Sequence, residues 1–325
     1  MPQIIEHNIV VPENYAKKRL DQALAALLPQ YSRSRIKIWI EKGMVSVDHN
    51  DKLRPKDILA GGEQVYIKAE LEKLIENEPE ELPLIIAHED DAVIVVNKPN
   101  GLVVHPAAGN RSHTLLNALL YYLPELSSMP RAGIVHRLDK NTSGLLVIAK
   151  TPAAHASLVK QLQQHDIVRE YEAVVVGVLT GGGTVDAPIG RHPKKRTHMA
   201  VRENGKPAIT HYRVIERFRA HAHIKLNLET GGTHQIRVHM ASIRHPIVGD
   251  QTYNGRFAIP KGATETLIQE LRLFKRQALH ARKLTFAQPI TNELITVQAD
   301  LPEDFKHLLH ILREDNSEDN DEGSS

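Results

Sequence analysis

An aspartate among basic residues is the first group in the sequence that could carry out chemistry. Asp139 lies in the segment His136-Arg137-Leu138-Asp139-Lys140. An apolar run at 145–149 follows, so we expect Asp139 on a loop next to a strand, where catalytic groups are often held. The basic neighbours favour the charged form of the carboxylate. Local chemistry alone favours another interpretation, an Asx turn that Thr142 or Ser143 completes.

A second segment, Thr233-His234-Gln235-Ile236-Arg237-Val238-His239, alternates apolar and polar residues. This alternation predicts a strand with Arg237 on its polar face. An arginine that is buried or lines a cleft needs a carboxylate or phosphate partner. The two histidines would fall on opposite faces and lack the HExxH pattern, and the chain has no cysteine, so we expect no metal site.

Tyr171 and several basic residues are the remaining candidates. Tyr171 enters a predicted strand, where a tyrosine either packs in the core with its hydroxyl at the edge or stacks on a base. Lys98 precedes a Pro-Asn-Gly turn, where it points at phosphate or is solvated. The loop at 191–198 is densely basic and favours a nucleic-acid contact. Its candidate RNA-binding residues are Lys194, Lys195 and Arg196.

Composition narrows the classes of function. The chain has 325 residues, 41% hydrophobic and 25% charged, which suits about two globular domains. It shows no run of eighteen apolar residues, no signal-peptide pattern, no dinucleotide fingerprint and no Walker loop, so we expect no membrane segment, no cofactor and a cytoplasmic location. The net charge is only +2, but acidic residues concentrate near 70–81 and 314–322. The remaining body is basic, which indicates a polyanionic partner.

Hydrophobic periodicity sets the expected domains. Residues 13–70 combine two helices with short strands at Val45 to Val47 and Val65 to Ile67. Residues 71–83 are expected to form an acidic linker, and residues 313–325 a disordered acidic tail. Residues 84–312 alternate apolar runs with glycine and proline, and 115–122 and 153–162 have helical patterns. We therefore expect an α+β domain on a large, mainly antiparallel mixed sheet.

The amino-terminal region resembles the S4 RNA-binding domain. The motif Tyr31-Ser32-Arg33-Ser34-Arg35 follows Arg19-Leu20-Asp21 and precedes Gly43. Basic groups at a helix start oppose the helix dipole, which indicates a role other than helix stability, such as phosphate binding. The resemblance implies a small α/β module that binds RNA through Arg33, Arg35 and Lys37. The family usually has an Asn-Gly turn where Asp48-His49 stands here.

Taken together, the segments resemble the RluA-type pseudouridine synthases from about residue 13 to 312. The motifs that carry the likeness are NKPNGLVVHP, HRLDKNTSGL, REYEAVV, THQIRVHM, HPIVGDQTYNG and ALHARKLTF. The resemblance implies that Asp139 is the catalytic aspartate, Tyr171 the base-stacking tyrosine and Arg237 the partner of the aspartate. Gly232 departs from the pattern, because the family usually has a basic residue there.

The resemblance implies an isomerase that converts uridine to pseudouridine in large-subunit (23S) ribosomal RNA, in the loop of helix 69. Asp139 attacks C1′ as a nucleophile or removes a proton from C2′ to give a glycal; sequence leaves both routes open. Arg137 is a further expected RNA contact. The partner is ribosomal RNA or the assembling large subunit, and the enzyme is expected to be a monomer. The alternatives are a non-catalytic rRNA-binding assembly factor on the same fold and a metal-dependent RNA hydrolase.

Overall fold

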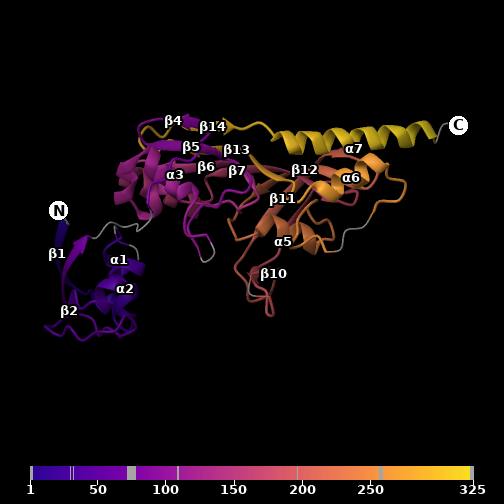
Figure 1. Ribbon diagram of the computed structural model, residues 1–325. Helices are drawn as coiled ribbons and strands as arrows, with labels where there is room; N and C mark the ends of the chain where they lie inside the picture. The colour runs from indigo at the N-terminus through magenta and orange to yellow at the C-terminus, as the bar shows by residue number, and fades with distance from the viewer. Residues whose placement is uncertain are drawn as a thin grey trace. The chain divides into compact units, whose positions relative to one another are not determined.

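The structure is a computed structural model that describes residues 3–29, 31, 33–71, 78–107, 110–195, 197–255 and 259–322. The chain divides into two compact units (Figure 1). The first comprises Met1–Glu76 with Ser127–Arg131, and the second comprises Asn77–Leu126 with Ala132–Ser325. Much of the expected linker, and Arg196 of the basic loop, lie outside the described residues.

The first unit is a three-stranded antiparallel sheet with two helices. The sheet has the order β1-β3-β2 and is formed by β1 (Gln3–Val10), β2 (Val45–Val47) and β3 (Gln64–Leu71). The helices are α1 (Leu20–Leu27) and α2 (Arg33–Glu41), and a 3-10 turn, η1 (Glu13–Tyr15), precedes them. Strand β1 pairs with β3 from Gln3 to Val10, so the sheet begins ten residues before the expected boundary at 13.

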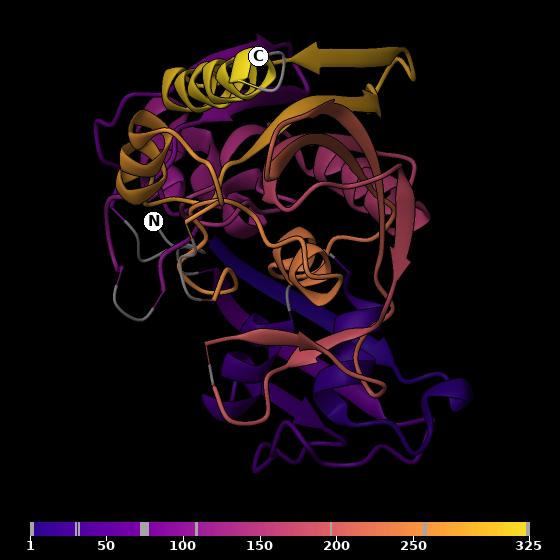
Figure 2. The same cartoon turned by 90° about the vertical axis from the view of Figure 1, so that its right-hand side faces the viewer.

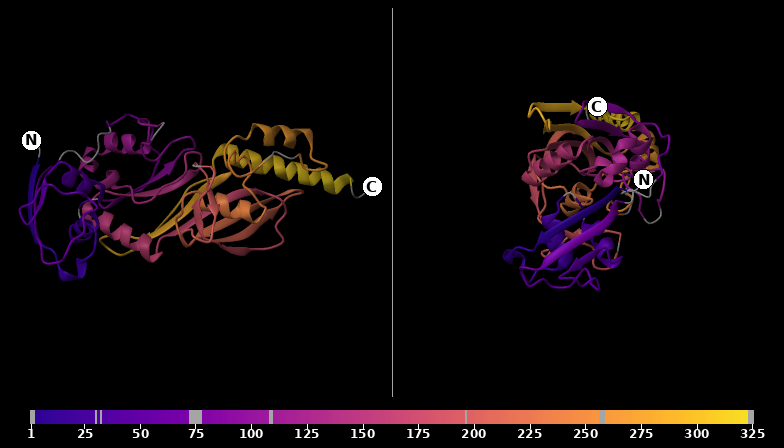
Figure 3. Two further views of the ribbon diagram at one scale, coloured as in Figure 1. Left: turned by 90° about the horizontal axis from the view of Figure 1, so that it is seen from below. Right: turned by 90° about the vertical axis from the view of Figure 1, so that its left-hand side faces the viewer.

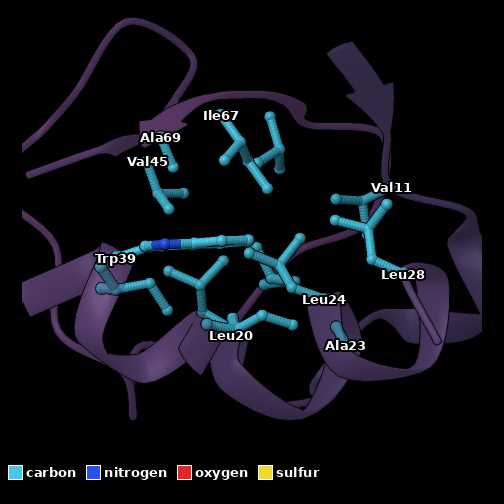
Figure 4. Packing of buried hydrophobic residues seen from close by; sticks show 13 residues of the cluster. Val11, Leu20, Ala23, Leu24, Leu28, Trp39, Val45, Ile67 and Ala69 are labelled. Carbon is cyan, nitrogen blue, oxygen red and sulfur yellow. The ribbon is translucent and has the colours of Figure 1, made fainter. Parts of the chain in front are cut away.

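The core of this unit is assembled around Trp39 of α2. Figure 4 shows the Trp39 ring between Val45 and Ile67 of the sheet and Leu20 of α1. These side chains are almost completely buried, and such burial supplies most of the stabilisation of a small domain. The predicted pattern of two helices and two short strands is confirmed.

The turn after β2 compensates for the missing Asn-Gly pair. Asp48 and His49 both adopt positive φ, 46° and 67°, which is the conformation that a two-residue hairpin turn requires. Aspartate tolerates this region because its short side chain can bond to nearby backbone. Asp48 Oδ1 does accept a hydrogen bond from the Gln64 amide, at 2.9 Å. The change of residue type therefore leaves the turn intact.

The second unit is built on a large mixed sheet with the strand order β4-β5-β6-β13-β7-β12-β11-β8, while β14 pairs with β13. Its strands are β4 (Ile86–Glu89), β5 (Val93–Lys98), β6 (Ser143–Ala149), β7 (Val168–Val176), β8 (Gly183–Asp186), β11 (Ile209–Arg217), β12 (His221–Leu228), β13 (Leu279–Ala287) and β14 (Leu294–Gln298). A separate hairpin joins β9 (Ile189–Arg191) and β10 (Met199–Val201). The expected mainly antiparallel mixed sheet is confirmed.

The parallel exception is the pairing of β6 with β13. Ser143 lies opposite His280, and Gly144 opposite Ala281. Gly144 has φ +114°, and a Cβ there would lie 2.3 Å from the Ala281 carbonyl oxygen, so only glycine permits this approach. The Ser143 hydroxyl also bonds to His280 Nδ1 at 2.9 Å. These contacts fix the start of β6, directly after the loop that carries Asp139.

Five helices accompany this sheet among the described residues. They are α3 (Leu115–Tyr122), α4 (Pro152–Gln164), α5 (Gln235–Ser242), α6 (Glu265–Leu273) and α7 (Glu303–Glu322), and two 3-10 turns, η2 (Pro124–Ser128) and η3 (Pro130–Gly133), follow α3. Helices α6 and α7 lie side by side in Figures 1 and 3. Figure 2 shows α5 almost end-on, on the inner side of the curved sheet. The predictions at 115–122 and 153–162 are confirmed.

The expected strand at 235–239 is wrong, because these residues begin helix α5. Every residue from Gln235 to Met240 is buried, so the alternation of apolar and polar types does not report which face is exposed. The polar side chains of this segment have hydrogen-bond partners inside the protein. Gln235 donates to the Ile209 carbonyl, and His239 bonds to Thr210 and to the Ala187 carbonyl.

The expected disorder from 313 is also wrong over most of its length, because α7 continues to Glu322. One of the acidic residues in this segment has a structural role that the composition did not indicate. Asp315 is buried; its side chain accepts hydrogen bonds from Arg219 Nε and the Thr264 amide, at 3.1 and 2.7 Å. The second unit therefore extends beyond residue 312.

Candidate active site

Asp139 lies on the loop between η3 and β6, as expected, but its side chain does not form the turn. The Thr142 amide donates to the backbone carbonyl of Asp139, at 3.0 Å. The Asx-turn interpretation is therefore wrong, and the carboxylate remains available. Its side chain is 16% exposed, which leaves it accessible from a cleft.

The buried side chain of Lys98 supports the loop that carries Asp139. The lysine is 1% exposed, and its ammonium donates to the carbonyls of Lys140, Pro99 and Leu102 at 3.0, 2.8 and 2.9 Å. Burial lowers the pKa of Lys98 to about 7, although the charge of Asp139 opposes that shift. The expected contact with phosphate is therefore wrong, because the charged end points into the protein and fixes the residue after Asp139.

Arg237 brings two carboxylates together. Its Nη1 donates to Asp139 Oδ2 at 2.9 Å, while Nε and Nη2 donate to both oxygens of Asp250 at 2.7 and 2.9 Å. Burial alone would lower the pKa of Arg237, but hydrogen bonds and charge from the two carboxylates raise it above its ordinary value. A planar guanidinium held in this way has one orientation, so the direction of the Asp139 carboxylate is also fixed.

Asp250 is the site residue that sequence reasoning missed. Its side chain is fully buried, and Oδ1 also accepts the amides of Thr252 and Tyr253 at 2.8 and 3.1 Å. A guanidinium has five N–H donors, and Asp139 uses only one of them. The sequence indicated only one acidic partner for Arg237, Asp139. The donors left over are the signal that a second carboxylate was needed, and Asp250 in the segment HPIVGDQTYNG supplies it.

Tyr171 of β7 shares a small cavity with Asp139. The cavity is also lined by Arg137, His234 and Gly232 and by apolar residues. These apolar residues are Leu138, Leu228, Ile236 and Leu279. Tyr171 is 6% exposed, and burial raises its pKa above the ordinary value. A second cleft of about 330 Å³ borders Asp139, Arg137 and Arg237. The structure thus brings together Asp139, Tyr171, Arg237 and Arg137.

His234 links the site to the β9–β10 hairpin. Its Nε2 lies 3.8 Å from Asp139 Oδ1, and its Nδ1 is 2.7 Å from the Tyr253 hydroxyl. That hydroxyl accepts a hydrogen bond from the Met199 amide at 2.9 Å, and the Arg237 guanidinium lies over the Tyr253 ring. Burial lowers the pKa of His234, so its neutral form is favoured at the site. Sequence reasoning considered His234 only as a metal ligand.

The remaining residues that were expected to bind RNA differ in where they lie. Arg137, Lys194 and Lys195 are exposed; the two lysines precede β10 on the hairpin and do not line the cavity of Asp139. Arg196 lies outside the described residues.

The basic residues of the first unit have partners within that unit. Arg33 donates to buried Asp21 through Nη2 at 2.8 Å, and Arg35 lies over the Trp39 ring at 6.0 Å. Lys37 is 3.6 Å from Glu41 on the same helix, and both side chains are more than half exposed. Because Arg19 also pairs with Asp21, two arginines share one carboxylate there and a positive charge remains.

Within the described ranges, no three His, Asp and Glu side chains gather closely enough to hold a metal ion. His239, one of the two histidines considered, is bonded to Thr210 and Ala187 inside the protein. Over the same ranges, no helix has the length and apolar character needed to cross a membrane.

Comparison with known proteins gives consistent matches. A sequence model of the family described as RNA pseudouridylate synthase matches residues 92–242. Ribosomal large subunit pseudouridine synthase D of Escherichia coli (strain K12) is 54% identical over 322 residues, 99% of each chain. The protein of the same name from Pasteurella multocida (strain Pm70) is 57% identical over 298 residues, 92% of each chain. The solved structure of human RNA Pseudouridylate Synthase Domain Containing 4 has a TM-score of 0.56 and 28% identity, and covers 70% of this chain and 93% of that one.

Proposed function

The chain belongs to the RNA pseudouridylate synthase family, and from that premise we propose that it isomerises uridine to pseudouridine in large-subunit ribosomal RNA, with Asp139 as the catalytic carboxylate. The relatives that match almost its whole length are named for that activity. The loop of helix 69 is the proposed target within the RNA.

The observation that carries the proposal is the hydrogen bond from Arg237 to Asp139 beside Tyr171. The bond is 2.9 Å long, and both residues line the same cavity as Tyr171. A carboxylate that is held by a guanidinium at the edge of a partly apolar cavity is suited to act on a sugar carbon while a base occupies the cavity. Tyr171 and Leu228 supply surfaces against which a uracil can pack.

The target uridine must leave its stack to reach Asp139. Extrusion of a base costs a few kcal/mol, and least in a loop, where proteins also read RNA most readily. Arg137 is exposed at the mouth of the site, and we assign it to the RNA backbone next to the target. The uracil then enters the cavity between Tyr171 and Ile236, with C1′ towards Asp139.

The reaction rearranges bonds within one nucleotide. The N1–C1′ bond breaks, the base turns in the cavity, and C5 forms the new bond to C1′. Asp139 either attacks C1′ to form a covalent ester or takes the C2′ proton to give a glycal. Arg237, fixed by Asp250, keeps the carboxylate in place on either route. Tyr171 then assists removal of the C5 proton, and the product is an isomer of the substrate.

Several finer assignments belong to the same proposal. We assign RNA binding to the first unit through Lys37 and the charge that Arg33 and Arg35 retain, and to the hairpin through Lys194 and Lys195. The enzyme is expected to act as a monomer in the cytoplasm, on ribosomal RNA or the assembling large subunit. The alternative of a non-catalytic assembly factor rests on Gly232 alone, and the intact pair of Asp139 and Arg237 argues against it.

The decisive experiment measures tritium release from large-subunit RNA labelled at uracil C5. The wild-type protein is compared with Asp139→Ala and with Asp91→Ala, which alters an exposed aspartate outside the site. We expect release from wild type and Asp91→Ala and none from Asp139→Ala. Equal release from wild type and Asp139→Ala would refute the role of Asp139, and no release from wild type would refute the activity.

A further inference from the structure

Arg169 is a buried cation without a partner. Its side chain is 7% exposed overall, and its Nε is buried with no hydrogen-bond acceptor. Within the part of the chain that the structure describes, its guanidinium has no hydrogen bond and no ion pair. Arg237, buried to a similar degree, has two carboxylates. An uncompensated buried charge is costly, so a protein that keeps one needs a reason.

The position of Arg169 points to the catalytic cavity. It stands two residues before Tyr171 on β7, and both side chains are on the buried face of the strand. Continuing the β7–β12 register one step past the pair Glu170–Asn227 sets Arg169 beside Leu228, which lines the cavity.

The guanidinium also lies close to the cavity wall. A Cβ at Gly231 would be 2.6 Å from Arg169 Nη1, so the guanidinium packs against the residue next to Gly232, which is part of the wall. The charge is close enough to act on two neighbours. Burial raises the pKa of Tyr171 and Arg169 opposes the rise; burial lowers the pKa of His136 to about 3 and Arg169 adds to the fall.

We propose that Arg169 is a further catalytic residue, whose guanidinium stabilises the negative charge that the uracil carries once its bond to C1′ has broken. This inference rests on the proposed function. On either route through Asp139, the electron pair of the N1–C1′ bond leaves with the uracil. The base becomes an anion, with its charge spread over N1, O2 and O4. When C5 bonds to C1′ and loses its proton, N1 regains a proton and the charge disappears.

A charge that exists only during the reaction explains why Arg169 has no permanent partner. A resident carboxylate would neutralise the guanidinium and remove its attraction for the uracil. An unpaired, preorganised cation beside the cavity instead favours the transition state over the bound substrate. Backbone phosphate is a poorer fit, because Arg169 lies on the buried face of the sheet next to residues that line the cavity.

Gly231 makes this arrangement possible. It has no side chain, so the guanidinium of Arg169 can lie against the backbone next to Gly232, which lines the cavity. Arg169 brings a positive charge to this wall from the neighbouring strand β7.

The test compares Arg169→Met, which removes the charge at similar length, with Arg169→Lys, which keeps it. Arg213→Met, at an exposed arginine, is the matched control. Single-turnover conversion is measured as loss of the target nucleoside, on RNA with uridine and on RNA with 5-fluorouridine at the target, by nucleoside analysis after digestion. The rearranged 5-fluorouracil keeps its fluorine, because C5 has no proton to lose. Fluorine withdraws electrons, which stabilises the uracil anion without the enzyme's help.

We expect Arg169→Met to slow conversion of uridine by about 100-fold or more, as when an oxyanion donor is removed, and conversion of 5-fluorouridine by less than about tenfold. Arg169→Lys should stay within about tenfold of wild type on both substrates. The Kd for RNA should not change. The melting temperature of Arg169→Met should equal or exceed that of wild type, because a buried unpaired charge is removed.

Three results would overturn the proposal: equal slowing on both substrates, a Kd raised in proportion to the slowing, or an Arg169→Met protein that is unfolded or less stable than wild type. The first shows that leaving-group charge is not the target, the second indicates phosphate binding, and the third a structural role. If wild type converts no uridine, the proposed function fails; if wild type and Arg169→Met are equally active, only this inference fails.

Discussion

Asp250 holds the guanidinium of Arg237 with both of its carboxylate oxygens, at 2.7 Å from Nε and 2.9 Å from Nη2. The catalytic candidate Asp139 receives only the remaining Nη1. Asp250 is completely buried and anchored by two backbone amides, whereas Asp139 is partly accessible. Asp250 thus fixes Arg237, and Arg237 in turn orients Asp139.

Asp250→Asn should lower kcat by about 10- to 100-fold with little change in KM, because Arg237 loses one charged partner and its orientation. The same change should cost about 3 kcal/mol of unfolding free energy, since a buried ion pair is broken. Steady-state tritium release and urea denaturation measure the two effects. Asp91→Asn, at an exposed position, is the control. An Asp250→Asn enzyme with wild-type kcat would refute the positioning role.

Tyr171→Phe should separate base packing from proton removal. The ring still fills the cavity, but the hydroxyl is gone, so loss of the C5 proton should slow by about 100-fold. Cleavage of the N1–C1′ bond should continue, and an RNA species retaining the C5 proton should accumulate in single-turnover samples. Tyr171→Leu, which also removes the ring, should impair both steps. Tritium release by Tyr171→Phe at the wild-type rate would show that the hydroxyl takes no part.

Lys98 should make stability depend on pH in a specific range. Its pKa is about 7 in the folded protein, against an ordinary value of 10.5, so between these values the unfolded chain binds one more proton. Its contribution to stability therefore rises with pH, by about 1.4 kcal/mol per pH unit from about pH 7 to 10.5, and is flat below pH 7.

Urea denaturation of wild type and Lys98→Met at pH 7.5, 8.5 and 9.5 tests this prediction. The difference in unfolding free energy should change in favour of wild type as the pH rises. Lys160→Met, at an exposed lysine, should track wild type. Parallel curves for wild type and Lys98→Met would mean that Lys98 titrates normally. The variant should also lose activity, because the Lys140 carbonyl loses its donor.

The basic hairpin loop should contribute to RNA affinity through charge alone. Lys194→Ala with Lys195→Ala should raise the Kd and reduce the slope of log Kd against log salt by about 1.4, from about 0.7 per phosphate contact. Fluorescence titrations from 50 to 200 mM salt measure this slope. The charge-matched control is Lys160→Ala with Lys275→Ala, both exposed. A slope equal to that of wild type would remove the loop from the RNA interface.

Strong local signals made most elements predictable. The two helices of the first unit, the helices after residues 114 and 151, and the strands on either side of Asp139 follow their hydrophobic patterns. The predictions of secondary structure failed where a segment is buried on all sides. Gln235 to Met240 reads as an alternating strand, but each polar residue there has an internal partner. The polar end of α7 likewise conceals the buried Asp315.

The site was predictable only where a motif carried it. Asp139, Tyr171 and Arg237 do meet at one cavity, although they are far apart in the sequence. Asp250 and Arg169 were not predicted, because their importance depends on their surroundings. Asp250 accepts from two donors of Arg237 that Asp139 leaves unused, and Arg169 is a cation whose Nε has no acceptor. Lys98 showed the opposite error, since a lysine beside a turn gives no sign that its charged end points inwards.

The parallel pairing of β6 with β13 determines when the protein can become active during its synthesis. Ser143 and His280 are 137 residues apart, and Arg237 reaches Asp139 across 98 residues. Contacts of such long range form late, and a chain that emerges from its amino terminus cannot form them until the distant strand has been made. The loop of Asp139 therefore remains without its final support until β13 has left the ribosome. On our proposal that the first unit binds RNA, the incomplete chain would hold RNA before it can modify it.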